Sequence, residues 1–136
     1  MIIPFFAGDL REVSPSVLAY IGDGVYDLYA RCWVAEHCSN KSGAMHKHTI
    51  KYVCAEVQAE AIRHLMDELT ETEENYFRRG KNSNPGSMAK NASPADYMYA
   101  TGFETLIGYL FLDNQEARLE YIINKVFEYL DNKDEE

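Results

Sequence analysis

The segment that most constrains this chain is LAYIGDGVY, residues 18–26, in which one acid lies between two glycines. A Ser-Pro pair at residues 14–15 signals a helix start, so we expect a helix from there to about Glu36. Its core-facing side should consist of the apolar residues at helical spacing: Val17, Ile21, Val25, Leu28 and Cys32. Because a glycine inside a helix costs about 1 kcal/mol relative to alanine, Gly22 and Gly24 predict close approach of another helix or a ligand.

A second acid, Glu104, has a similar setting beside a glycine in the apolar segment GFETL, residues 102–106. Asp23 and Glu104 would each lie in the middle of a packed helix, where a carboxylate needs a partner. Two packed helices can direct both carboxylates at one point and hold Mg²⁺, with water and substrate phosphate oxygens completing the coordination. The alternative is that the two acids pair with Lys47 or Lys51, or lie at the surface.

Hydrophobic periodicity predicts an all-α chain in which no segment requires a strand. After a turn that follows the first helix, we expect one long helix up to about Leu69, with a break near His48 as the alternative. An amphipathic final helix should start at Asn114. Residues 1–13 show no sustained period and should form an arm that packs onto the body through its apolar residues: Phe5, Phe6 and Leu10.

Local start signals mark two further helices. Thr70 and Glu73 fit a capping box, which should open a short helix that ends at Gly80. A second Ser-Pro pair at residues 93–94 opens a segment that is apolar nearly all round up to about Leu112. A helix of that kind should lie at the centre of the fold.

The composition is that of one globular domain: 136 residues, 46% of them hydrophobic, with apolar runs too short to span a bilayer. The N-terminal segment lacks the basic flank and full apolar core of a signal peptide, so we expect a cytoplasmic protein without a membrane partner. Three cysteines cannot all pair, and Cys32 and Cys54 fall on apolar helix faces. Reduced structural thiols are therefore the expected state.

The net charge of −9 argues against a protein that coats nucleic acid through its global charge. Two stretches nevertheless contain no acid, and we call them the basic islands. The first, residues 38–54, includes Lys47 and Lys51, and the second, residues 76–95, includes Arg78, Arg79, Lys81 and Lys90. These side chains are candidate contacts for phosphate groups; chance clustering on solvated faces is the alternative.

Two motifs resemble those of ribonuclease III. Residues 18–26 resemble its signature, Glu-Arg-Leu-Glu-Phe-Leu-Gly-Asp-Ala-Val-Leu, and residues 100–108 resemble its second motif, Ala-Asp-x-x-Glu-Ala-Leu-Ile-Gly. Three further matches are typical of the compact Mini-ribonuclease III subfamily: RGKN at residues 79–82, the Lys90-Asn91 pair, and the run YMYATGFE at residues 97–104. The resemblance covers nearly the whole chain in element order.

The resemblance implies an all-α fold, a ribonuclease III catalytic-domain-like helical bundle over residues 1–136, with an acidic tail at about residues 131–136. It also implies a homodimer that hydrolyses double-stranded RNA with Mg²⁺, leaving a 5′ phosphate and a 3′ hydroxyl. Subfamily resemblance suggests the 23S ribosomal RNA precursor as substrate. We expect no double-stranded RNA binding domain of the kind that longer relatives append, so the catalytic body should bind the duplex itself.

Asp23 and Glu104 match metal ligands of the family and are the expected catalytic residues, whereas Ala19 and Thr101 stand where the family has a Glu and an Asp. Asp27, one turn beyond Asp23, could hold a metal-bound water as an outer-shell group. The expected RNA-binding residues come from both basic islands: Lys47, Lys51, Arg78, Arg79, Lys81, Asn82, Lys90 and Asn91. The expected dimer interface surrounds the small residues of the first helix: Ala19, Tyr20, Gly22 and Gly24.

One functional alternative comes from another class of protein. A non-catalytic, helical, dimeric module that binds RNA or protein would also use the basic islands, and the absence of carboxylates at Ala19 and Thr101 favours it. Retention of Asp23 and Glu104 argues against it, because a scaffold without activity has no need for two costly acids beside glycines.

Overall fold

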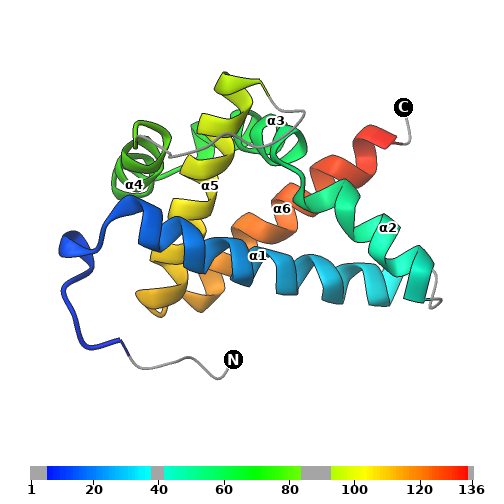
Figure 1. Cartoon of the computed structure of the whole chain (residues 1–136), viewed down its shortest axis with the longest axis horizontal. Coiled ribbons are helices and arrows are strands. Elements are labelled where there is room, and N and C mark those ends of the chain that lie inside the picture. The colour runs from blue at the N-terminus through cyan, green and yellow to red at the C-terminus, as the bar shows by residue number, and fades with distance from the viewer. Residues whose placement is uncertain (1–5, 38–41, 84–92, 135–136) are drawn as a thin grey trace.

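The computed structural model describes residues 6–37, 42–83 and 93–134, and within these ranges its regular structure is entirely helical, as predicted (Figure 1). The elements are the 3₁₀ turns η1 (Leu10–Glu12) and η2 (Met66–Glu68) and the helices α1 (Pro15–His37), α2 (Ser42–Val53), α3 (Ala55–Leu65), α4 (Glu71–Lys81), α5 (Pro94–Leu112) and α6 (Glu116–Asp134). No helix in the described part of the chain is both long enough and apolar enough to cross a bilayer.

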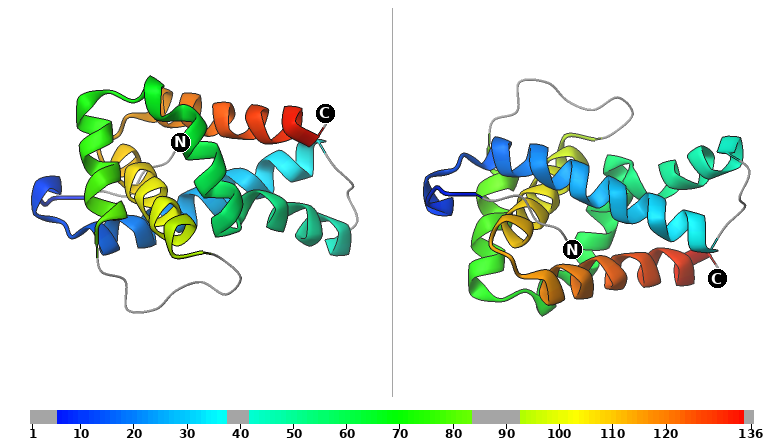
Figure 2. Two further views of the ribbon diagram at one scale, coloured as in Figure 1. Left: turned by 90° about the horizontal axis from the view of Figure 1, so that it is seen from above. Right: turned by 90° about the horizontal axis from the view of Figure 1, so that it is seen from below.

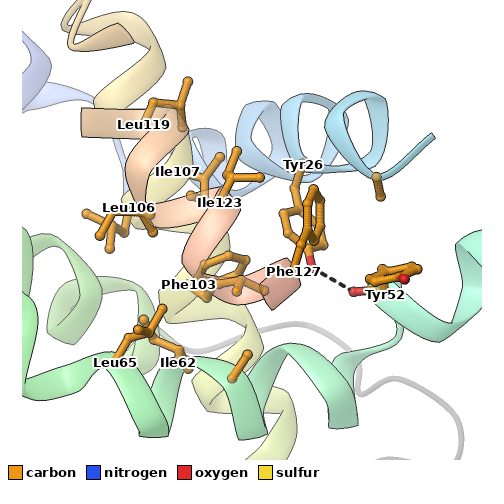
Figure 3. Packing of buried hydrophobic residues seen from close by; sticks show 14 of the residues in the cluster. Tyr26, Tyr52, Ile62, Leu65, Phe103, Leu106, Ile107, Leu119, Ile123 and Phe127 are labelled. Atoms are coloured by element: carbon orange, nitrogen blue, oxygen red, sulfur yellow. Dashed lines mark hydrogen bonds between the residues drawn. The ribbon is translucent and has the colours of Figure 1, made fainter. Parts of the chain in front are cut away.

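Helix α5 runs through the middle of the molecule, with α1, α3 and α4 packed around it (Figures 1 and 2). Its apolar surface is buried on nearly all sides, which confirms the central place that the sequence predicts. The centre of the core is aromatic, because Phe103 of α5 meets the ring of Tyr26 of α1 edge to face at 5.1 Å (Figure 3). Phe127 of α6 lies against the same Tyr26 ring at 5.7 Å.

Helices α1 and α5 cross at their backbones. A Cβ added to Gly22 would collide with the carbonyl oxygen of Glu104, and a Cβ added to Gly108 would collide with the carbonyl oxygen of Leu18. The close approach predicted for Gly22 is therefore confirmed. The same prediction for Gly24 is wrong within the subunit, because a Cβ there would have no atom within 4 Å.

The side of α1 that faces the core differs from the predicted one. Its buried residues are mostly small: Leu18, Ala19, Gly22, Tyr26, Ala30 and Val34. Of the predicted core face, Val17 is 48% and Leu28 61% exposed and Cys32 is exposed, whereas Ile21 and Val25 are half-buried and Val25 packs against the core. The prediction followed the spacing of apolar residues, but the backbone contact of Gly22 with α5 sets which side of α1 faces the core.

The long helix predicted up to Leu69 is broken, and the break lies at Cys54 rather than at His48. Cys54 has extended dihedral angles, φ −71° and ψ 150°. The break leaves backbone carbonyl groups without helical partners, and two side chains donate hydrogen bonds to them. The Tyr26 hydroxyl donates to the Tyr52 carbonyl at 2.8 Å (Figure 3), and Gln58 Nε2 donates to the Val53 carbonyl at 2.9 Å. No glycine or proline marks this site, so local sequence does not predict it.

Most predicted helix ends are confirmed. Thr70 and Glu73 form the capping box of α4, and the Ser93 hydroxyl accepts from the Asp96 amide at the start of α5. Helix α4 ends one residue beyond Gly80, and α6 begins at Glu116. Asn114 instead occupies the turn before α6 with φ 59°, a left-handed conformation that asparagine tolerates. Of the predicted arm, Phe6 is partly exposed and Phe5 lies outside the described residues.

Gly22→Ala should destabilise the protein by roughly 1 to 3 kcal/mol or more, because the added methyl group would push α1 and α5 apart at their closest contact. Urea denaturation followed by circular dichroism measures the change. Ser16→Ala, at an exposed position of the same helix, is the control and should stay within about 0.5 kcal/mol of the native protein. Equal stability of the two variants would contradict the backbone contact.

Candidate active site

The crossing of α1 and α5 brings the two mid-helix acids together. Glu104 is mostly buried, and Asp23 lies beside it on the exposed shoulder of α1. Burial, together with the hydrogen bond to Asp23 and the negative charge of Asp23, raises the pKa of Glu104 to about 9. The partner of Glu104 is thus the other acid rather than a lysine, and the pair needs either a shared proton or a cation.

The donor set fits a hard divalent cation. Two carboxylates on neighbouring helices offer oxygen ligands. Because Glu104 is mostly buried, a bound cation would stabilise its charged form. In the ranges that the structure describes, no cluster of three or more His, Cys, Asp or Glu side chains comes together. A site this sparse suits Mg²⁺, which keeps several waters and takes further oxygens from a phosphate-containing substrate.

Ala19 and Thr101, which stand where the family has acids, contribute no carboxylate to the site, so Asp23 and Glu104 are its carboxylates. Ala19, one turn before Asp23, is buried against the core. The Thr101 hydroxyl donates to the carbonyl of Tyr97 at 3.0 Å, so it is engaged within its own helix. Water must supply whatever ligands a metal lacks at these positions.

Asp27 has a cation of its own. Its Oδ2 accepts a hydrogen bond from Nε of Arg31 at 2.8 Å, in an ion pair that is partly exposed. Asp27 is one turn from Asp23 on the same shoulder of α1, but it does not join Asp23 and Glu104 as a third ligand. An outer-shell role for Asp27 would require it to reach a metal-bound water while paired with Arg31.

The candidate RNA-binding residues lie on two separate helices. Lys47 and Lys51 are exposed on α2, and Arg78, Arg79 and Asn82 are exposed at the end of α4. Figures 1 and 2 show α2 and α4 on opposite sides of α5. The described basic residues of the two islands therefore flank the helix that carries Glu104. Lys90 and Asn91 lie outside the described residues.

The basic side chains of α4 are held by their neighbours. The Arg79 guanidinium lies over the Tyr76 ring at 5.1 Å and donates to the Val13 carbonyl at 3.4 Å. The Lys81 ammonium lies over the Tyr99 ring at 5.1 Å, and Arg78 pairs with Glu74 at 3.3 Å. These contacts limit the freedom of the side chains and so reduce the entropy lost when they bind a ligand.

Sequence reasoning missed a fourth cation at this end of the molecule. Arg63 of α3 lies over the Tyr99 ring at 4.4 Å and pairs with Asp96 at 2.8 Å, so Tyr99 contacts cations from two helices. Nothing in the local sequence of α3 distinguishes Arg63 from other surface arginines. Its place follows only from the packing of α3 on α5.

The outer face of α1 carries a strip of exposed apolar residues. Tyr20 is 82% exposed, and Val17 and Leu28 lie on the same side of the helix, with the open Gly24 between them. Because Tyr20 is exposed, its ring does not pack inside its own subunit. Ala19 and Gly22, which the sequence analysis assigned to a dimer interface, are buried against the core, because the α1–α5 crossing uses them.

The raised pKa of Glu104 makes stability depend on pH. The folded state keeps the Glu104 proton in a range where the unfolded chain, with a pKa near 4.5, has lost it. The resulting stability is complete below about pH 4.5 and is lost as the pH rises towards 9. The metal-free protein should lose roughly 2 to 3 kcal/mol of unfolding free energy from pH 6 to pH 8, since each pH unit is worth about 1.4 kcal/mol.

Urea denaturation in EDTA at the two pH values measures this loss, with Glu104→Gln as the control. The variant has no titrating group at this position, so its stability should change less. Identical pH dependence of the two proteins would show that the Glu104 carboxyl is not protonated in the folded state.

Comparison with known proteins agrees with this geometry. The ribonuclease III domain family matches residues 16–115. Mini-ribonuclease 3 of Clostridium tetani is 45% identical over 126 residues, covering 90% of this chain and 82% of that protein, and its Thermoanaerobacter counterpart is 42% identical over 112 residues, covering 82% and 79%. The crystal structure of protein FN1578 from Fusobacterium nucleatum superposes with a TM-score of 0.80 at 25% identity, covering 90% of this chain and 98% of that one. The chain therefore belongs to the ribonuclease III family and is an endoribonuclease of its Mini-ribonuclease 3 group.

Proposed function

We propose that the protein is a homodimeric, Mg²⁺-dependent endoribonuclease that cleaves double-stranded RNA and matures the 23S ribosomal RNA precursor. The observation that carries the proposal is the Asp23–Glu104 pair at the α1–α5 crossing. Two acids in mutual contact, one of them mostly buried, destabilise the fold unless a cation binds between them. Residues of the ribonuclease III signature and its second motif form this pair.

In this proposal Asp23 and Glu104 hold the metal. When bound, Mg²⁺ supplies a hydroxide nucleophile and stabilises the leaving oxygen of the phosphodiester. Glu104 has to release its proton for the metal to bind, and the divalent charge offsets both the burial and the repulsion from Asp23 that raise its pKa. Binding should therefore strengthen as the pH rises towards 9.

The basic islands serve as the duplex-binding surface. Lys47 and Lys51 on α2 and the group Arg78, Arg79, Lys81 and Asn82 on α4 flank the α1–α5 crossing. A-form RNA is recognised mainly through its phosphates and 2′-hydroxyls, which suits these side chains better than base readout. Lys90 and Asn91 belong to the same proposed surface on sequence grounds.

The outer face of α1 supports a two-fold dimer. Val17, Tyr20, Gly24 and Leu28 follow one another at spacings of three and four residues, as in a helix–helix seam. Gly24 leaves room for a partner backbone, and Tyr20 projects beside it, so the face is self-complementary about a two-fold axis. Because one active site cuts one strand, two sites related by this axis would cut both strands.

The ribosomal substrate rests on the resemblance to the Mini-ribonuclease III subfamily alone. It is tested by offering the protein a duplex that contains the paired ends of a 23S precursor and an unrelated duplex of equal length. Preferred cleavage of the precursor at one defined bond on each strand supports this substrate. If both duplexes were cut equally and at scattered bonds, the protein would be a double-stranded RNA endonuclease, and the proposed ribosomal substrate would be wrong.

A non-catalytic RNA- or protein-binding module remains the second candidate, favoured by the absence of carboxylates at Ala19 and Thr101. It predicts that the duplex is bound but stays intact with Mg²⁺. Incubation of a long RNA duplex with Mg²⁺, and separately with EDTA, distinguishes the two functions, since only the proposed enzyme yields metal-dependent fragments.

Asp23→Asn should reduce duplex cleavage more than roughly 100-fold, because it keeps the side-chain shape but removes a charge that holds the metal. Duplex binding in EDTA and the helical circular dichroism signal should be nearly unchanged. Asp67→Asn, an exposed acid in η2, is the matched control and should cleave normally. Wild-type cleavage by Asp23→Asn would show that the site is misassigned.

Tyr20→Ala should shift the protein from dimer to monomer in sedimentation and should reduce cleavage of both strands at the same time. The fold of the subunit should survive, because the Tyr20 ring is 82% exposed. Tyr121→Ala, which removes a partly exposed tyrosine of α6, is the control and should remain dimeric. A native protein that sediments as a 15.6 kDa monomer would contradict the dimer altogether.

A further inference from the structure

Helix α4 contacts α5 in the same way as α1 does, through glycine. A Cβ added to Gly80 would collide with the side chain of Thr105 and would lie 3.0 Å from the Cα of Gly102. A Cβ added to Gly102 would in turn meet the ring and the carbonyl oxygen of Phe77, each at 2.7 Å. The Thr105 side chain and the Phe77 ring fill the space at this contact, so the packing fixes the position of α4 relative to α5.

This contact lies next to the active site. Thr105 follows Glu104 directly, is fully buried, and donates its hydroxyl to the carbonyls of Thr101 at 2.7 Å and Pro15 at 3.3 Å. Pro15 is the first residue of α1, the helix that carries Asp23. The end of α4, the start of α1 and the middle of α5 therefore meet at one point beside Glu104.

The other end of α4 is held independently. Glu73, in the capping box, accepts two hydrogen bonds from the Arg118 guanidinium of α6, each at 2.8 Å. One turn further along, the Tyr76 ring stacks on Tyr109 of α5 at 3.9 Å. Because α4 is held at both ends, its basic C-terminal residues lie at a fixed distance from Glu104.

We propose that Gly80 is a positioning residue for RNA: its contact with Thr105 and Gly102 sets the spacing between the basic end of α4 and the Asp23–Glu104 pair, and so determines which phosphodiester bond is cut. The inference rests on the proposed function. A duplex held by Arg78, Arg79 and Lys81 moves with α4, whereas the metal stays with α1 and α5. A displacement of about 1 Å between substrate and reacting groups can cost about 100-fold in rate.

Gly80→Ala tests the spacing by forcing α4 away from α5. On an end-labelled RNA duplex with one defined cut, we expect the cut to move to neighbouring bonds and kcat to fall roughly 10- to 100-fold. Duplex affinity in EDTA and the rise in melting temperature caused by Mg²⁺ should stay close to the native values, because the basic residues and the two acids are all retained. A purely structural role would lower stability without moving the cut.

Phe77→Leu tests the same contact without added bulk. It leaves a gap against Gly102, loosens α4, and should spread the cut over adjacent bonds even if Gly80→Ala fails to fold. Ile123→Val, a truncation in the buried face of α6, is the control and should cut at the native bond.

The outcomes separate this inference from the function on which it rests. If the native protein does not cut the duplex with Mg²⁺, the proposed function is wrong. If the native protein cuts and the folded variants at Gly80 and Phe77 cut the same bond at the native rate, the positioning role of Gly80 is wrong.

Discussion

The crossing of α1 and α5 at Gly22 and Gly108 is the contact on which the rest of the structure depends. Because the two backbones touch, Asp23 and Glu104 come within hydrogen-bonding range although 80 residues separate them in the chain. A larger side chain at either glycine would separate the helices and with them the two carboxylates. Glycine is costly inside a helix, and here the cost is offset by tight packing and by formation of the site.

The same crossing explains the electrostatics of the site. Glu104 lies on the central helix, where it loses most of its hydration, and the charged group that acts on it is another acid, Asp23. Both effects favour the protonated form of Glu104 in the site without a cation. A divalent cation reverses this preference, which couples metal binding to proton release and to stability. In the proposed site two carboxylates would suffice, because substrate and water can complete the shell of a hard metal ion.

Helix α1 has two apolar faces with different uses. On the inner face Gly22 allows backbone contact with α5 and Leu18 and Tyr26 are buried beside it, whereas Val17, Tyr20 and Leu28 remain outside. An exposed apolar strip of this kind on a small protein marks an interaction surface. Helix α4 repeats the glycine contact on another side of α5 through Gly80 and Gly102, so Glu104 sits on a helix held at backbone contact by two neighbours.

Local sequence determined the helical class, the capping box at Thr70 and Glu73, the start of α5 at Ser93, and the identity of the two acids, because propensities, caps and motifs act within a few residues. Only the tertiary structure decided which face of α1 is buried, where Asp23 meets Glu104, and that the chain breaks at Cys54, where Tyr26 and Gln58 bond the freed carbonyls from other turns. The same holds for Arg63 and Tyr99, which meet across α3 and α5. Each of these depends on which surfaces come into contact, and that choice is made by packing between helices rather than by any single helix.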